Sequence, residues 1–200
     1  MKMTKLELRS QQMRLKSLLK YLPTLQLKKG LLQVELQAAR QTADHVEKLL
    51  SLETRRCEEF APLLSEPLQI DLQQMVAIKQ LFLGHENHAG IELPIFEKVE
   101  FNEIDYALEE TPVWLDGVLI ALRGLKRLKI EREISQKRVE KLEQELREIT
   151  TRVNLFEKIL IPRTEKAIRK ISVFLSDLQL SAVARAKVAK SKIQARKNAS

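Results

Sequence analysis

The stretch Arg152–Ile171, RVNLFEKILIPRTEKAIRKI, carries apolar residues at helical spacing on both sides of Pro162. A proline inside a helix removes one backbone donor and clashes with the preceding turn, at a cost of roughly 3 kcal/mol. The apolar spacing nevertheless continues beyond the proline. The sequence therefore predicts one long helix that passes through Pro162 with a kink and does not end there.

Two long stretches of the chain repeat apolar residues at alternating steps of three and four, which is the heptad pattern of a coiled coil. The first stretch has three polar breaks, and its positions are Leu8, Gln11, Leu15, Leu18, Leu22, Leu25, Lys29, Leu32, Leu36, Ala39, Ala43, Val46, Leu50, Glu53, Cys57 and Phe60. The second breaks twice, and its positions are Trp114, Val118, Ala121, Leu125, Leu128, Arg132, Ser135, Val139, Leu142, Leu146, Ile149, Val153, Phe156 and Leu160. Two such rows predict a pair of long helices that pack along their heptad faces.

The heptad steps change at Pro162. The apolar row continues there at Leu160, Thr164, Ala167, Ile171, Phe174 and Leu178, which amounts to a four-residue insertion in the heptad. Such a stutter locally unwinds a supercoil. Pro23 lies within the first heptad row, and the sequence leaves open whether it kinks that helix or divides it.

The region between the two rows lacks the heptad pattern. Residues that end or start helices bound it, namely Pro62, Pro67, Thr111 and Pro112. Inside it lie two β-prone runs, residues 78–83 and 91–101, with two glycines and an asparagine between them. They predict a β-hairpin or a pair of extended segments.

These patterns together predict an all-α dominated fold, a long antiparallel two-helix coiled coil with a small middle segment containing a β-hairpin. We expect residues 1–60 to form the N-terminal helix and residues 113–200 the C-terminal helix. Residues 61–112 would form the middle segment with a short helix and the hairpin. The whole would be one elongated domain.

The composition suits exposed helices and a reducing compartment. Only 4% of the residues are aromatic and 5 are glycine, while 31% are charged. The single cysteine, Cys57, excludes an intramolecular disulfide, and MKMTKLELRS at the start lacks an apolar signal-peptide core. The apolar runs are far shorter than the ~20 residues of a membrane span. We therefore expect a cytoplasmic protein.

The positive charge is concentrated at the two ends of the chain. The net charge is +8, yet residues 1–30 alone hold eight Lys or Arg against one acid, and residues 178–200 hold six without any acid. The rest of the chain is therefore net acidic. In an antiparallel pair, both basic ends lie at the same end of the coiled coil.

Residues able to perform catalysis or to bind a cofactor are scarce. No glycine-rich phosphate loop exists, because Gly84 and Gly90 lack a following Lys-Ser/Thr. His85, Glu86 and His88 could suggest a metal site, but HENH lacks the HExxH spacing, and we interpret these residues as ordinary turn residues. Cys57 occupies a heptad position, which favours a buried apolar role. The sequence indicates no catalytic residue, no cofactor and no metal.

Two motifs resemble the D-subunit family of V-type and A-type rotary ATPases. The first is the family's C-terminal helix signature, R-V-N-x-x-E-x-x-L-I-P-x-x-E-x-x-I-x-x-I, matched here by Arg152, Val153, Asn154, Glu157, Leu160, Ile161, Pro162, Glu165, Ile168 and Ile171. The second is N-x-A-G-V-x-L-P-x-F, matched by Asn87, Ala89, Gly90, Leu93, Pro94 and Phe96. The chain departs from the family's L-L-K-x-K-R-D-x-L segment, having LQLKKGLLQVEL at residues 25–36. It therefore resembles a divergent branch of the family, that of the bacterial V-type enzymes.

The resemblance implies a mechanical role and no catalysis by this chain. Family members form the central shaft of the rotor, coupling ATP hydrolysis or synthesis to ion transport across the membrane. Their implied partners are the catalytic A/B hexamer, the F subunit, and the C (or d) subunit, which links the shaft to the membrane ring. The implied location is peripheral, at the cytoplasmic face of the membrane.

Two further expectations concern the ends of the helices. If the hairpin pairs Phe60 near Trp114, Pro162 lies opposite Gln12, and the second helix extends beyond the first from about residue 173. Solvated cations near the C-terminus would then contact the hexamer pore, namely Arg185, Lys187, Lys190 and Lys192. The alternative is a basic coiled-coil scaffold or a nucleic-acid-binding protein, in which the same tail contacts phosphates by charge alone.

Overall fold

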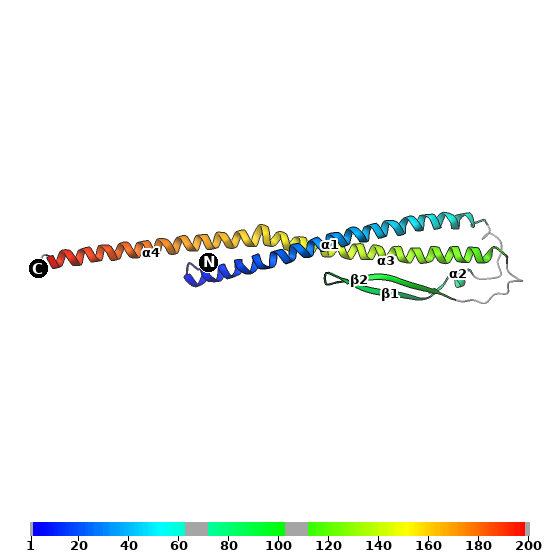
Figure 1. The fold of residues 1–200 in the computed structure, drawn as a ribbon, viewed down its shortest axis with the longest axis horizontal. Helices are drawn as coiled ribbons and strands as arrows, with labels where there is room; N and C mark the ends of the chain where they lie inside the picture. Colours follow the sequence, from blue (N-terminus) through cyan, green and yellow to red (C-terminus); the bar gives the residue numbers. More distant parts are fainter. Residues whose placement is uncertain (1, 63–71, 103–111, 199–200) are drawn as a thin grey trace. The chain divides into compact units, whose positions relative to one another are not determined.

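The computed structural model describes residues 2–62, 72–102 and 112–198. In chain order the elements are α1 (Lys5–Glu59), α2 (Leu72–Met75), β1 (Ile78–His88), β2 (Ile91–Phe101), α3 (Leu115–Asn154), the π-helical turn η2 (Leu155–Leu160) and α4 (Ile161–Asn198) (Figure 1). The predicted fold class is confirmed, with two long helical stretches and a β-hairpin between them. The expected helix end at Pro67 and the cap at Thr111 lie outside the described residues.

The described chain comprises two compact units. One contains residues 28–148, and the other contains residues 1–27 with residues 149–200. Helix α1 contributes to both. Within the part of the chain that the structure describes, no helix is both long and apolar enough to span a membrane.

Helix α1 runs without interruption through Pro23, so this proline does not divide it. At its start the Thr4 hydroxyl accepts a hydrogen bond of 3.2 Å from the backbone N–H of Glu7, as an N-cap side chain does. Every position of the predicted heptad row from Leu8 to Phe60 is buried or half-buried. The heptad prediction for this helix is therefore confirmed.

In the unit of residues 28–148, α1 and α3 lie side by side and run antiparallel (Figure 1). Arg40 pairs with Glu143 at 2.6 Å, whereas Glu47, further along α1, pairs with Arg132, earlier on α3, at 2.7 Å. The heptad row of α3 is buried or half-buried throughout, and Leu142 is fully buried. Arg132, a polar break in the predicted row, therefore sits in the row close to a carboxylate of α1, although its buried Nε forms no hydrogen bond among the described residues.

The predicted β-hairpin is present, and its register follows from a two-residue turn. His88 pairs with Ile91, so Ala89 and Gly90 form the turn, with φ values of 53° and 79°. Two consecutive positive φ angles are those of a type I′ turn, whose twist matches that of the strands. The Asn87 side-chain oxygen accepts a 3.0 Å hydrogen bond from the Gly90 N–H. Irregularities interrupt the ladder between Ile78 and Gln80 and between Phe82 and Leu83.

A small apolar cluster holds the start of the hairpin against α3. Met75, Leu115 and Leu119 are buried together, with Leu72, Val76 and Trp114 packed around them. The guanidinium of Arg123 on α3 donates to the Met75 carbonyl at 2.9 Å and to the Asn102 carbonyl at 2.8 Å. One α3 side chain therefore satisfies two backbone acceptors, one shortly before β1 and one directly after β2.

In the other unit the helix continues through Pro162, as predicted, but the turn before it is not α-helical. Over η2 the helix widens, and the Ile161 N–H bonds to the Phe156 carbonyl, five residues back. This is the place where the heptad steps change. Burial ends further on, because Ile171 is fully buried whereas Phe174 is 43% and Leu178 is 51% exposed. The end of pairing predicted near residue 173 agrees with this change.

Candidate functional site: helix signature, hairpin tip and basic tail

The helix signature centres on the π turn. Asn154 ends α3, Glu157 lies within η2, and Pro162 is the second residue of α4. The Glu157 carboxylate accepts a short hydrogen bond from the Gln26 side-chain amide of α1. Arg152 and Glu165 are exposed. The signature therefore combines polar contacts and exposed charges around one irregular turn and does not gather its side chains into a catalytic cluster.

The chemistry of the π turn follows from the missing donor of Pro162. Without an N–H, this residue leaves the carbonyl four residues earlier without its usual helical partner. The Thr164 hydroxyl, buried in the heptad row, donates to the Leu160 carbonyl at 2.7 Å. The carbonyl that Pro162 leaves without a donor is that of Lys158, so the Thr164 bond is a local side-chain-to-backbone contact and does not replace the missing one.

A cavity of about 310 Å³ adjoins this turn. Its lining brings together Gln11, Arg14, Leu160, Arg163, Thr164 and Ala167. Residues on both sides of Gln12 therefore face residues on both sides of Pro162, in agreement with the register expected from the sequence.

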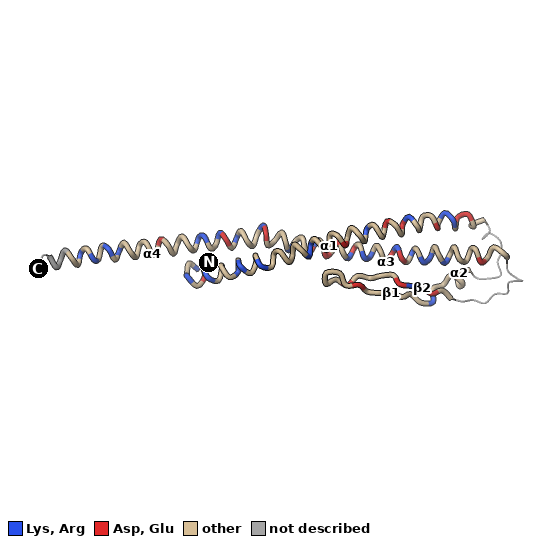
Figure 2. Tube along the Cα trace, in the orientation of Figure 1, with Lys and Arg blue, Asp and Glu red and all other residues tan. Residues whose placement is uncertain are grey.

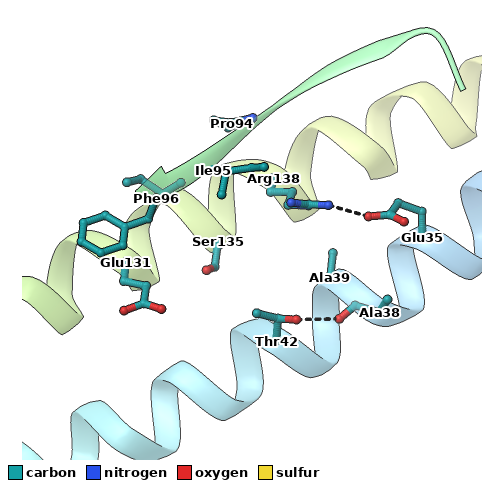
Figure 3. A pocket seen from close by; sticks show the side chains of 11 residues that line it. Glu35, Ala38, Ala39, Thr42, Pro94, Ile95, Phe96, Glu131, Ser135 and Arg138 are labelled. Carbon is teal, nitrogen blue, oxygen red and sulfur yellow. Dashed lines mark hydrogen bonds and ion pairs between the residues drawn. The ribbon is translucent and has the colours of Figure 1, made fainter. Parts of the chain in front are cut away.

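The second motif forms the tip and inner face of the hairpin. Asn87 and Gly90 build the turn, and Leu93 is fully buried. Pro94 and Phe96 line a cavity of about 210 Å³ against α1 and α3 (Figure 3). The Phe96 ring centroid lies 5.8 Å from the guanidinium carbon of Arg127. The motif residues therefore specify how the hairpin turns and how it packs on the helices.

Four polar side chains from three elements meet beside this cavity, and we name them the tip ring: Glu35 of α1, Glu86 and His88 of β1, and Arg138 of α3. The Arg138 Nη2 donates to Glu35 at 2.6 Å (Figure 3). It also donates to Glu86 at 3.2 Å. The His88 Nε2 lies 3.0 Å from Glu86, and its Nδ1 lies 3.3 Å from Glu35. Each carboxylate therefore faces one guanidinium and one imidazole.

Sequence reasoning treated His88 and Glu86 as turn residues and did not find the tip ring. The hydrogen bond from His88, with a further contribution from Arg138, holds the pKa of Glu86 below its usual range. Among the described residues, no group of three or more His, Cys, Asp and Glu is arranged to hold a metal ion. In the sequence, the tip ring is indicated only by the opposite charges of its members. Its two helical members, Glu35 and Arg138, lie 103 residues apart in the chain.

Cys57 is half-buried at its heptad position. Burial raises the pKa of its thiol, and the neighbouring Glu53 carboxylate acts in the same direction. A thiol kept protonated is a poor nucleophile. The apolar role expected for Cys57 therefore fits its surroundings better than redox or nucleophilic chemistry.

The basic tail occupies the C-terminal part of α4, where Lys and Arg recur without any acid after Asp177 (Figure 2). The four cations named from the sequence are exposed, and none forms an ion pair within the described residues: Arg185, Lys187, Lys190 and Lys192. Apolar side chains alternate with them, including Val183, Val188 and Ile193, which are more than half exposed. Cationic and apolar surface therefore occur together on this helix.

Packed antiparallel helices, a β-hairpin between them in the chain and an exposed basic helical end define a helical-hairpin class of protein. Comparison with known proteins identifies which kind. The family model for the ATP synthase D subunit matches residues 7–191, and the chain belongs to that family. The resemblance inferred from the two motifs is confirmed.

The relatives match over almost the whole chain. The V-type ATP synthase D subunit of Chlamydia pneumoniae is 43% identical over 197 residues, which cover 98% of this chain and 94% of the relative. Its counterpart in Chlamydia muridarum is 41% identical over 197 residues, covering 98% and 97%. The one in Chlamydia caviae is 38% identical over 200 residues, covering 100% and 96%. These relatives are bacterial and V-type, as expected from the departure of residues 25–36 from the family's usual segment.

Proposed function

We propose that this chain is the non-catalytic central-stalk component of a V-type rotary ATPase, coupling ATP hydrolysis or synthesis to ion transport. The observation that carries this function is the D-subunit family match over residues 7–191, which include the hairpin and most of both long helical stretches. The fold suits the role, since torque passes along a packed helical pair whose apolar rows are buried together. The comparisons give no support to the alternative of a basic scaffold or nucleic-acid-binding protein.

Reconstitution tests this function directly. The catalytic subunits and the membrane sector would be assembled in vesicles with and without this chain, and both ATP hydrolysis and ATP-driven ion uptake would be measured. We expect ion uptake only when the chain is present. Equal uptake in its absence would refute the stalk function.

The partners and location are finer parts of the same proposal. Shared identity with V-type D subunits supports membership of a rotary ATPase. Within it we propose contacts with the catalytic A/B hexamer, with the F subunit and with the C (or d) subunit, which connects to the membrane ring. The complex would hold the chain peripherally at the cytoplasmic face of the membrane. We further propose that residues 1–60 and 113–200 act as the shaft and that residues 61–112 act as an appendage to it.

We propose that the exposed cations of α4 contact the pore of the hexamer. Surface ion pairs are worth about 0 to 1 kcal/mol each, so several of them can hold a rotating helix without locking it in one orientation. The support is that these side chains are exposed and without ion pairs within the described residues: Arg185, Lys187, Lys190 and Lys192.

Charge reversal tests the pore contacts. Changing those four cations to glutamate should weaken assembly with the hexamer, and the loss should depend on salt. The matched control reverses four exposed cations of the other unit, Lys48, Arg55, Lys129 and Lys141. Equal assembly of both variants, measured by co-elution with the hexamer at several salt concentrations, would reject the contacts.

A further inference from the structure

Like charges meet across the helix pair beside the π turn, whereas opposite charges meet across the other helix pair. Charges that flank the apolar row of a helix pair usually face their opposites. The unit of residues 28–148 follows this rule, and its pairs between α1 and α3 are Arg40 with Glu143, Glu47 with Arg132, and Glu35 with Arg138. At the cavity beside the π turn, both helices contribute an arginine, Arg14 from α1 and Arg163 from α4.

These two arginines have no acidic partner among the described side chains. Neither forms an ion pair there, and no residue that lines their cavity is acidic. Their own helices offer no carboxylate at the neighbouring positions, three and four residues away, which are Ser10, Gln11, Ser17 and Leu18 for Arg14, and Ile159, Leu160, Lys166 and Ala167 for Arg163. Glu7, one turn before Gln11, accepts a hydrogen bond of 2.8 Å from the Gln11 amide. The two guanidinium charges therefore lack a counter-charge from the chain.

The cavity between them has the size and polarity that suit a hydrated anion. Its volume is about 310 Å³, whereas one water molecule takes up about 30 Å³ of the liquid. Apart from Leu160, the rest of its lining is small or polar, namely Gln11, Thr164 and Ala167. The cavity therefore has room for an ion of the size of phosphate together with several waters, which bridge gaps too long for a direct hydrogen bond.

The charge of the surrounding unit favours an anion at this place. Residues 1–27 and 149–200 together contain 18 Lys or Arg and 4 acidic residues, a net charge of +14, although the whole chain carries only +8. Such a field raises the local concentration of anions. Repulsion between Arg14 and Arg163 weakens the contact between their helices, and an anion that neutralises both removes this repulsion.

We propose that Arg14 and Arg163 form an anion site, which binds one inorganic phosphate ion between α1 and α4. Each guanidinium presents a planar fork of N–H donors that fits phosphate oxygens, and two guanidiniums neutralise both charges of a phosphate dianion. The bound ion links the two helices beside the π turn and stabilises this helix pair. The site belongs to the chain itself and does not depend on its role in a rotor.

NMR of the full chain, labelled with nitrogen-15 arginine, follows the individual guanidinium groups. Phosphate replaces chloride stepwise at constant ionic strength and pH, so the general screening of charge does not change. The Nε–H signals of Arg14 and Arg163 are assigned from the single variants Arg14→Lys and Arg163→Lys. Both signals should shift along one saturable curve. Signals that shift without saturation, or that do not shift, overturn the site.

Matched double variants decide whether this pair of arginines binds the ion. Arg14→Gln with Arg163→Gln removes the two charges that line the cavity, whereas Arg9→Gln with Arg169→Gln removes two exposed charges of the same helices that do not line it. Glutamine and arginine have similar helix propensities, so both variants should fold.

Thermal melting compares these variants with the unchanged chain. Phosphate should raise the melting temperature of the unchanged chain and of the control variant at similar concentrations. The cavity variant should need about tenfold more phosphate for the same rise, because it lacks two exposed ionic contacts. An equal response of the two variants would assign the effect to the general charge of the unit and overturn the site.

Malonate distinguishes phosphate from the carboxylates of a partner protein, since its two carboxylates carry the same charge as a phosphate dianion. Phosphate should act at the lower concentration, because its oxygens surround one small centre and face both guanidiniums at once. The reverse order would overturn phosphate as the ligand and assign the arginine pair to acidic side chains.

Discussion

Pro162→Ala should stabilise the unit of residues 1–27 and 149–200, but by less than a buried helical proline normally costs. Proline in a helix interior is less favourable than alanine by about 3 kcal/mol. At Pro162 part of this cost is already relieved, because the helix is widened over η2, where the Ile161 N–H bonds five residues back, and a wider turn reduces the clash between the proline ring and the preceding turn. We expect a gain of about half the full value, roughly 1.5 kcal/mol.

Pro23 is the matched control, since it lies inside a regular α-helix with no π turn assigned. Pro23→Ala should gain close to the full ~3 kcal/mol. Hydrogen exchange followed by mass spectrometry would measure the local opening free energies of peptides covering residues 155–171 and 15–30. A gain at Pro162 as large as that at Pro23 would show that the π turn relieves nothing. A loss of stability at Pro162 would refute the reasoning altogether.

The same variant tests the prediction that the helix is kinked at Pro162 and that the kink has a function. An off-axis helix lets one shaft present different faces to equivalent subunits of a hexamer, so a straightened helix should couple poorly. We expect Pro162→Ala in a reconstituted complex to hydrolyse ATP with reduced ion transport per ATP. Higher stability with unchanged coupling would mean that the kink is merely tolerated.

Three further predictions concern the unit of residues 28–148. Ala89→Gly should stabilise the hairpin by about 1 kcal/mol in thermal melts, because glycine adopts the required positive φ without strain, and a loss would contradict the turn assignment. Leu142→Ala should cost about 2 to 5 kcal/mol in denaturant unfolding, whereas Leu52→Ala, at a 58% exposed position, should cost little. The hydrogen bond from Arg40 lowers the pKa of Glu143, so this contact stabilises the fold at neutral pH and is lost as the pH falls through the lowered pKa. In a profile of unfolding free energy against pH, Glu143→Gln should therefore lose less stability on acidification than the unchanged chain.

The helices were predictable because heptad spacing depends on local geometry. On an α-helix, steps of three and four keep side chains on one face, so the row from Leu8 to Phe60 faced inward as expected, including its polar members Lys29 and Glu53. The stutter at Pro162 was also visible in the spacing. Its form was not. The spacing was interpreted as a four-residue insertion that unwinds the supercoil, whereas the structure has one π turn, which adds a single residue to the helix.

The hairpin was predictable only in part. The β-prone runs and the turn glycine located its strands, but β1 extends to His88, through the residues interpreted as a turn. The tip ring joins side chains that are distant in sequence, and their meeting depends on how the hairpin lies along α1 and α3. No local pattern specifies that placement, so Glu35 and Arg138 resembled ordinary solvated charges.

The π turn also makes this helix unusually tolerant of a change in length. From Ile149 to Thr164 the row of buried side chains uses one residue more than two heptads would. Deleting one residue within Leu155–Leu160 would let the turn close as regular α-helix and leave the flanking apolar faces in phase. The same deletion in the middle of α3 would rotate every later side chain by about 100° away from its partners. Gain or loss of a single codon at this turn is therefore a route by which related chains can differ in length while keeping one continuous row of buried side chains.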